Sequence, residues 1–240
     1  MSIINKLLSG KAKEYLKKKV GVPDMFVSLE RLKNLGFNPK QIVDVGAFEG
    51  EWTAAVSQIF PAAKILMCEA MPAKEAKLKL LTNHNPNIDY EIAVLGAEDG
   101  KDVFFTELET ASSVLEEQSA THNRVARKTS SLNAVLTKRN IPKVDLIKLD
   151  VQGYELEVLK GFDKYIATAD AILTEASLLE IHKGVPLVRD VINYMGESGF
   201  VLYDICSVST RRPLDNALWQ TDLLFIKQNS IFRQDKRYNA

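Results

Sequence analysis

The sequence has no surplus of charge of either sign, because its 31 Lys and Arg residues balance its 31 Asp and Glu residues. Binding to nucleic acid depends on cationic side chains that neutralise phosphates, so the composition predicts no nucleic-acid partner, leaving room only for a local basic patch. Cysteine is also scarce. Cys68 and Cys206 lie far apart without the spacing of metal ligands, and the apolar run around Cys68 is typical of a small buried thiol.

Long apolar runs are missing as well, since none approaches the ~20 residues that span a bilayer. The N-terminal stretch lacks the apolar core and small-residue cleavage site of a signal peptide. These absences predict a cytoplasmic protein with no transmembrane segment. A chain of 240 residues that is 46% hydrophobic can bury one large core, which predicts a single globular domain.

The N-terminal region has helical patterning. Residues Ile3 to Val20 form a basic amphipathic stretch that either docks on its own domain, which we favour, or lies on a membrane surface. A second helix is predicted from Met25 to Leu35, with Gly36 as its C-cap. We therefore expect residues 1–35 to be a helical segment packed on a domain of residues 36–240.

From residue 41 onward, strand and helix patterns alternate. Apolar runs predict strands at residues 41–45, 64–68, 90–94, 145–150, 171–174, 200–203 and 222–226. Amphipathic patterns predict helices at residues 51–60, 73–83, 131–139, 155–160 and 187–198. We also expect an edge strand at residues 102–106 and a loop at 107–128. The pattern predicts a doubly wound α/β fold: a mostly parallel seven-stranded sheet with helices on both faces and an antiparallel C-terminal strand.

The first of these strands runs into two glycines in the stretch VDVGAFEGEWT, where Gly46 follows the strand and Gly50 opens the next helix. Such a turn favours glycine because a ligand approaches the backbone closely or because φ is positive. A dinucleotide-binding loop has G-x-G-x-x-G, but Phe48 stands at its middle glycine and Glu51 adds negative charge near a pyrophosphate site. Asp44 suits a cationic amino group, so we expect a ligand that carries adenosine and an amino acid.

The end of the second strand adds an acidic residue at the expected distance. Glu69 follows the glycine turn by about 20 residues, where a carboxylate accepts hydrogen bonds from ribose hydroxyls. Met71 and Pro72 come next and can form a wall against an adenine face. A solvated carboxylate and an ordinary core methionine remain the alternative interpretations.

Four stretches resemble the FkbM family of methyltransferases in the right order: VDVGAFEGEWT, CEAMP, DLIKLDVQGYELEVLKGF and WQTDLLFIK. The third, Asp145 to Phe162, is the most specific, and the resemblance covers about residues 38–227. It implies an S-adenosylmethionine-dependent methyltransferase that methylates a hydroxyl of a sugar, polyketide or other secondary metabolite. The chain departs from the family at Phe48, where Asn is common, and at Asn133, where Asp is common.

The resemblance implies roles for individual residues. Asp44, Gly46 and Gly50 match the cofactor loop, and Glu69 matches the acid that binds the ribose. Ala93 falls near the adenine, and Asp150 falls beside the reacting methyl group.

Methyl transfer also needs a group that takes the acceptor's proton, and three candidates lie at or just beyond strand ends: Asp150, Glu175 and His182. His182 titrates near neutral pH without tuning, though an exposed loop histidine explains it equally well. Asp150 and Glu175 could instead hold Mg²⁺, which the sequence leaves open. The other functions that remain are a non-catalytic binding module and a nicotinamide-dependent oxidoreductase. The sequence identifies neither the acceptor nor the oligomeric state.

Overall fold

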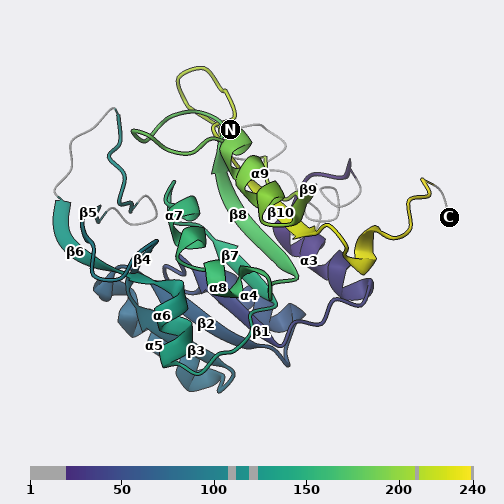
Figure 1. The fold of residues 1–240 in the computed structure, drawn as a ribbon, viewed down its shortest axis with the longest axis horizontal. Coiled ribbons are helices and arrows are strands. Elements are labelled where there is room, and N and C mark those ends of the chain that lie inside the picture. Colours follow the sequence, from purple (N-terminus) through teal and green to yellow (C-terminus); the bar gives the residue numbers. More distant parts are fainter. Residues whose placement is uncertain (1–19, 108–111, 119–123, 209–210, 239–240) are drawn as a thin grey trace, which may run out of the picture.

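A seven-stranded sheet forms the centre of the computed structural model, which describes residues 20–107, 112–118, 124–208 and 211–238 (Figure 1). Its strand order is β3-β2-β1-β7-β8-β10-β9, and β10 is antiparallel to both of its neighbours while the other pairs are parallel. The strands are β1 (Gln41–Val45), β2 (Lys64–Glu69), β3 (Ile88–Ile92), β7 (Leu146–Leu149), β8 (Ala171–Ser177), β9 (Phe200–Ile205) and β10 (Gln220–Lys227). The fold class expected from the sequence is confirmed.

Helices cover both faces of the sheet because its central strands are apolar on both sides. The cores on the two faces alternate along each strand: Val43 and Ile147 pack on one side, Ile42 and Leu146 on the other. The face of Ile42 and Leu146 is covered by α3 (Met25–Asn34), α4 (Glu51–Ile59) and α5 (Glu75–His84), and the face of Val43 and Ile147 by α6 (Leu132–Lys138), α7 (Glu155–Lys160) and α9 (Val188–Glu197).

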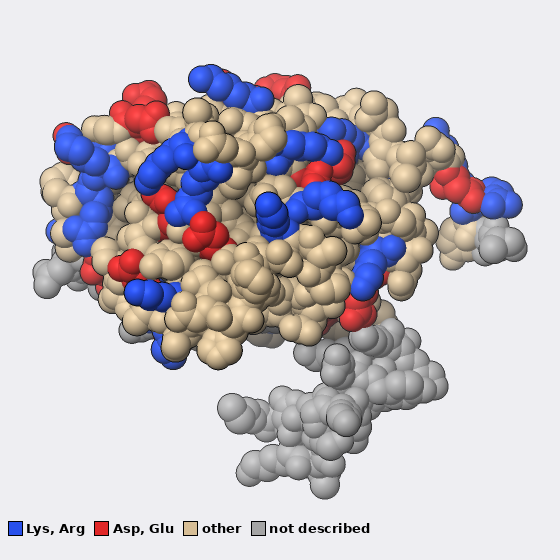
Figure 2. Space-filling model, turned by 90° about the horizontal axis from the view of Figure 1, so that it is seen from below, with Lys and Arg blue, Asp and Glu red and all other residues tan. Residues whose placement is uncertain are grey.

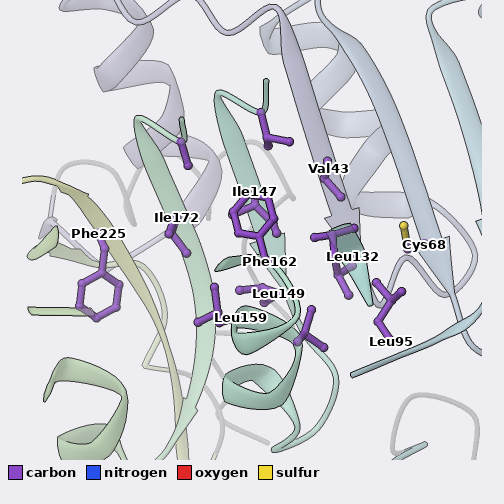
Figure 3. Close-up of a cluster of buried hydrophobic side chains, with 14 of the residues drawn as sticks. Val43, Cys68, Leu95, Leu132, Ile147, Leu149, Leu159, Phe162, Ile172 and Phe225 are labelled. Carbon is purple, nitrogen blue, oxygen red and sulfur yellow. The ribbon is translucent and has the colours of Figure 1, made fainter. Parts of the chain in front are cut away.

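Figure 3 shows the second of these cores, where Val43, Ile147, Ile172 and Phe225 reach from four strands of the sheet. Phe162, which follows α7, belongs to the same cluster and is fully buried. Leu146, Ile147 and Leu149 of β7 are all 0% exposed, as a central strand requires. The short helix α8 (Asp163–Ile166) and two single 3-10 turns complete the described helices.

A second sheet of three strands lies beside the main one, with β6 (Arg124–Ser131) between β4 (Val94–Gly96) and β5 (Asp102–Thr106). Two expectations were wrong here. The single strand expected at residues 90–94 is two strands, because the pairing with β2 ends with the Ala93 N–H donating to the Glu69 carbonyl, and from Val94 the chain pairs with β6 instead. The loop expected at residues 107–128 contains the start of β6, whose polar, half-exposed residues gave little apolar alternation.

The helix expected at residues 3–20 lies outside the described residues apart from Val20, as do residues 108–111 and 119–123 of the expected loop. The second expected helix is α3, capped by the Asp24 side chain and joined to β9 by a Ser28–Asp204 hydrogen bond. None of the described helices combines the length and the apolar content that crossing a membrane needs. The face of the molecule that is seen from below the view of Figure 1 carries both cationic and anionic side chains (Figure 2).

Candidate active site

A cavity of about 470 Å³ lies at the edge of the sheet where the parallel strands end. Its wall includes Gly46 after β1, Glu69 at the end of β2 and Asp150 after β7. Because β10 is antiparallel, its first residue, Gln220, lies at the same edge, and Phe105 of the small sheet closes another side. Open α/β sheets bind their ligands at this edge.

Close packing explains both glycines of the loop between β1 and α4. Gly46 has φ of 77°, and a β-carbon there would lie 1.8 Å from the backbone oxygen of Asp150. Gly50 has φ of 82°, and a β-carbon would meet the Leu81 side chain at 2.2 Å. The positive φ expected for this turn is therefore present, while the atoms that exclude a side chain belong to the protein itself.

Phe48 in the same loop also has a positive φ, of 50°, which costs a non-glycine residue about 1 kcal/mol. Asn tolerates this conformation best among ordinary residues, so the departure of Phe48 from the Asn of the resemblance adds backbone strain. The Phe48 ring lines the cavity and lies 3.9 Å from the Lys74 ammonium nitrogen, measured to the ring centroid.

Glu69 is buried on the cavity wall, where two backbone N–H groups hold its carboxylate. Phe48 N donates to Oε2 at 2.7 Å and Met71 N donates to Oε1 at 2.8 Å. Burial raises the pKa of Glu69, and these backbone hydrogen bonds counteract that rise. Each oxygen keeps a lone pair for a ligand hydroxyl.

Met71 and Ala93 also line the cavity, at the end where β2 and β3 finish. Val94 and Phe105 pack with Met71 in a small apolar cluster. This part of the wall is therefore apolar, and Glu69 beside it supplies the polar contact that orients a ligand.

Lys148 of β7 joins two carboxylates beneath the glycine turn. Its ammonium nitrogen lies 3.3 Å from Asp44 Oδ1 and 3.4 Å from Asp150 Oδ2, and it donates to the Gly46 carbonyl at 3.2 Å. Burial alone would lower the pKa of Lys148, but the charges of Asp44 and Asp150 outweigh it and raise the pKa. The ion pairs therefore keep this buried lysine charged.

The two carboxylates differ in access. Asp44 is 0% exposed, accepts a 2.7 Å hydrogen bond from the Thr53 hydroxyl and lies behind the cavity wall. The Asp150 side chain is 37% exposed and lies on the wall. Asp44, which was expected to hold a ligand's amino group, thus pairs with Lys148 behind the wall. Asp150 is the carboxylate that a ligand can reach.

Glu175 lies behind two glutamines that line the cavity. Gln152 Nε2 donates to Asp150 Oδ1 at 3.0 Å and lies 3.4 Å from both Glu175 oxygens, and Gln220 Nε2 also donates to Glu175. Burial and the neighbouring charges of Asp150 and Glu155 raise the pKa of Glu175 well above its ordinary range. Glu175 does not line the cavity itself, but its oxygens hold the amides of Gln152 and Gln220, which do.

His182 is buried away from the cavity wall, in the segment after β8. Its backbone forms an isolated bridge with Glu117, and burial lowers the pKa of its imidazole. The structure thus brings Gly46, Glu69, Met71, Ala93 and Asp150 together on the wall and leaves Asp44, Gly50, Glu175 and His182 off it.

Sequence reasoning assigned no role to Gln152, Trp219 or Gln220, which all line the cavity. Trp219 and Gln220 are the first residues of the motif WQTDLLFIK. Because the final strand was expected to be antiparallel, its first residues were bound to lie at the ligand-binding edge of the sheet, so the sequence did contain the information needed to find them. Gln152 has φ of 53°, a strained conformation that such sites often contain. Within the described residues, no three or more His, Cys, Asp and Glu side chains form a group that could hold a metal ion, so Mg²⁺ gains no support.

The arrangement defines a doubly wound α/β protein with a ligand cavity at the carboxyl edge of its sheet. Residues 44–202 match the Methyltransferase FkbM domain, a span of more than half of the chain that includes Asp44, Glu69, Asp150 and Glu175. The chain belongs to this methyltransferase family.

One curated relative is the hexuronic acid methyltransferase AglP of Haloferax volcanii, which is 32% identical over 79 residues. The match covers 33% of this chain and 30% of AglP, so the two are compared over less than a third of the relative. Two solved structures are similar in arrangement. The precorrin-6y C5,15-methyltransferase of Geobacter metallireducens has a TM-score of 0.48 at 11% identity, covering 85% of this chain and 86% of its own. The N-terminal domain of EvdMO1, solved with S-adenosylhomocysteine (SAH) bound, has a TM-score of 0.48 at 9% identity, covering 94% and 84%.

Proposed function

We propose that this chain is an S-adenosylmethionine-dependent O-methyltransferase that acts on a hydroxyl of a sugar, polyketide or other small metabolite. The observation that carries the proposal is Glu69, a buried carboxylate with free lone pairs beside an apolar wall, in a chain of the FkbM family. Glu51 also lines the cavity at the start of α4, where a pyrophosphate would be repelled. A nicotinamide dinucleotide is therefore the poorer ligand.

The cavity fits the cofactor in size and in the order of its walls. A volume of about 470 Å³ is typical of a site for a small organic ligand. Glu69 would hold the ribose hydroxyls, while Met71 and Ala93 would lie against the adenine. Asp150 would be the carboxylate within reach of the amino-acid end, because Asp44 is behind the wall. When bound, S-adenosylmethionine supplies an activated methyl group.

The chain's own residues would position the acceptor and take its proton. Asp150 lies on the cavity wall, where its carboxylate can accept a hydrogen bond from an acceptor hydroxyl and then its proton. Lys148 and Gln152 fix the two Asp150 oxygens from different sides, which orients the carboxylate before the acceptor binds.

Calorimetry with separate ligands tests the cofactor assignment. We expect S-adenosylmethionine and SAH to bind and NAD to bind more weakly, and tighter binding of NAD would overturn the proposal. Incubation with labelled S-adenosylmethionine and extracts of the source organism tests the reaction. Cofactor binding without transfer of label to any extract component would instead favour a non-catalytic binding module.

A further inference from the structure

We propose that the acceptor end of the cavity recognises a neutral, hydroxyl-rich sugar ring and disfavours acceptors that carry a carboxylate. This inference rests on the proposed function, because it concerns the acceptor of the same site. It depends on four residues at the β7, β8 and β10 end of the cavity: Gln152, Glu175, Trp219 and Gln220.

The buried carboxylate of Glu175 fixes how two amides on the cavity wall are turned. The amide nitrogens of both Gln152 and Gln220 face Glu175, and the Glu175 oxygens accept hydrogen bonds from them. The amide oxygen of each glutamine then points away from Glu175. No hydrogen bond to either oxygen is formed by the described residues, so both are available to a ligand.

These oxygens make the acceptor end a set of hydrogen-bond acceptors. Gln152, Gln220 and the accessible carboxylate of Asp150 each accept from a donor such as a hydroxyl. A ring with several hydroxyls supplies donors to all three. A ligand carboxylate has no proton to donate at neutral pH and would leave the oxygen that it faces unpaired.

The charges at this end act in the same direction. Among the described residues on the wall, Lys148 is the one cation, and Asp44 and Asp150 already pair with it. Glu175, Glu155 and Asp222 add further carboxyl groups behind the wall, close enough to influence one another's ionisation. An anionic acceptor would therefore meet the Asp150 carboxylate, while Lys148, the cation of the described wall, is already paired.

Trp219 supplies the apolar surface that a sugar ring needs. Its half-buried indole lines the cavity next to Gln220, and its backbone is fixed because its carbonyl accepts from Leu178 N at 2.8 Å. The C–H face of a pyranose packs on such a ring while the hydroxyls at its rim reach the polar groups beside it. The four residues together therefore match a neutral sugar.

Tryptophan fluorescence of the SAH-loaded protein tests this without relying on turnover. The probes are the methyl glycosides of glucose, mannose and galactose, each paired with its methyl uronide, which differs only by a carboxylate at C6. At least one neutral glycoside should give a saturable change that disappears in Trp219→Phe. Its uronide should bind at least tenfold more weakly.

The variant Glu175→Gln tests whether the preference for neutral glycosides depends on the orientation of the two amides or only on the shape of the cavity. Glutamine has nearly the same shape but brings N–H donors to this position, so the amides of Gln152 and Gln220 become free to turn and the tenfold preference should fall below threefold. Equal or tighter binding of the uronides to the wild type, or an unchanged preference in Glu175→Gln, would overturn the inference. Absence of glycoside binding while calorimetry still shows SAH binding would overturn it and leave the proposed function standing. Absence of SAH binding would remove both.

Discussion

Gly46 lies against the backbone of Asp150 so closely that a β-carbon at position 46 would be 1.8 Å from the Asp150 carbonyl oxygen. Gly46→Ala must therefore push apart the ends of β1 and β7 in addition to straining φ. Gly100 offers a matched control, because its φ of 74° is similar and nothing lies within 4 Å of its β-carbon position. Comparing the two separates the clash from the cost of φ.

We expect Gly100→Ala to lower the free energy of unfolding by about 1 kcal/mol, the cost of a left-handed residue. Gly46→Ala should lose about 1–3 kcal/mol more, the usual cost of overpacking, and should also weaken cofactor binding because Asp150 shifts. Urea denaturation and calorimetry with SAH measure the two effects. Equal losses of stability in both variants would mean that the Asp150 peptide moves aside freely.

Lys148→Met should destabilise the protein strongly, because it leaves the fully buried Asp44 carboxylate without a counter-charge. Breaking a buried ion pair from one side costs about 3–5 kcal/mol. In Asp44→Asn/Lys148→Met much of the loss should return, since the buried charge is then gone. Lys160→Met is a suitable control because Lys160 is half-exposed on α7, where an ion pair contributes little. A Lys148→Met protein as stable as the control would contradict the role given to this ion pair.

Glu155→Gln should change how stability depends on pH. Burial raises the pKa of Glu155 from 4.5 to about 7, so the folded protein holds a proton that the unfolded chain releases at lower pH. The stability linked to this proton is complete below pH 4.5 and is lost as the pH rises through about 7. The loss amounts to roughly 3 kcal/mol.

Glutamine does not titrate, and its oxygen can still accept from Val151 N and Gly153 N. Thermal unfolding should therefore show the wild type losing stability relative to Glu155→Gln between pH 5 and pH 8. A difference between the two proteins that stays constant over this range would rule out a titrating Glu155.

The main sheet could be predicted because its strands are nearly continuous apolar runs. Leu146, Ile147 and Leu149 are buried on both faces, and burial of this kind leaves a clear sequence pattern. The small sheet could not be predicted in the same way. Strand β6 begins with the residues RVARK, of which three are exposed, so its pairing with β5 comes from tertiary context.

The site divides along a similar line. Glu69 and Asp150 were predictable because the ends of parallel strands share one edge, and both lie on the cavity wall. Asp44 also ends up at a strand end, but no local pattern indicates that Lys148 from another strand pairs with it. His182 was expected near the reaction centre but does not line the cavity, because the segment after β8 pairs with Glu117. That contact joins residues 65 positions apart, which no local pattern indicates.

Glu69→Ala should weaken SAH by about ten- to a hundredfold, the loss expected for hydrogen bonds to a charged group worth roughly 1.5–3 kcal/mol. Because Glu69 also accepts from Phe48 N and Met71 N, this variant removes support from the loop itself. Glu69→Gln keeps an acceptor there, so it should lose less affinity than Glu69→Ala. Glu197→Ala, on the exposed side of α9, should bind SAH normally. Unchanged affinity in Glu69→Ala would mean that Glu69 does not contact the cofactor.

The proton acceptor is tested by comparing Asp150→Asn with His182→Ala on a verified acceptor. Asp150 is the accessible carboxylate on the cavity wall, so Asp150→Asn should keep the fold and lose turnover by ~10²–10⁴-fold, the usual contribution of a positioned base. His182 lies off the wall and its imidazole pKa is lowered by burial, so His182→Ala should keep most of its turnover.

Two measurements distinguish the ways in which Asp150 could act. If SAH affinity falls together with turnover in Asp150→Asn, the carboxylate contributes to cofactor binding, whereas intact affinity with lost turnover indicates a base. Activity that is abolished by chelation and restored by Mg²⁺ would assign the carboxylate to a metal instead. A large loss in His182→Ala with cofactor affinity intact would reverse the assignment, because a residue outside the described cavity wall would then have to reach the acceptor through a rearrangement of the segment after β8.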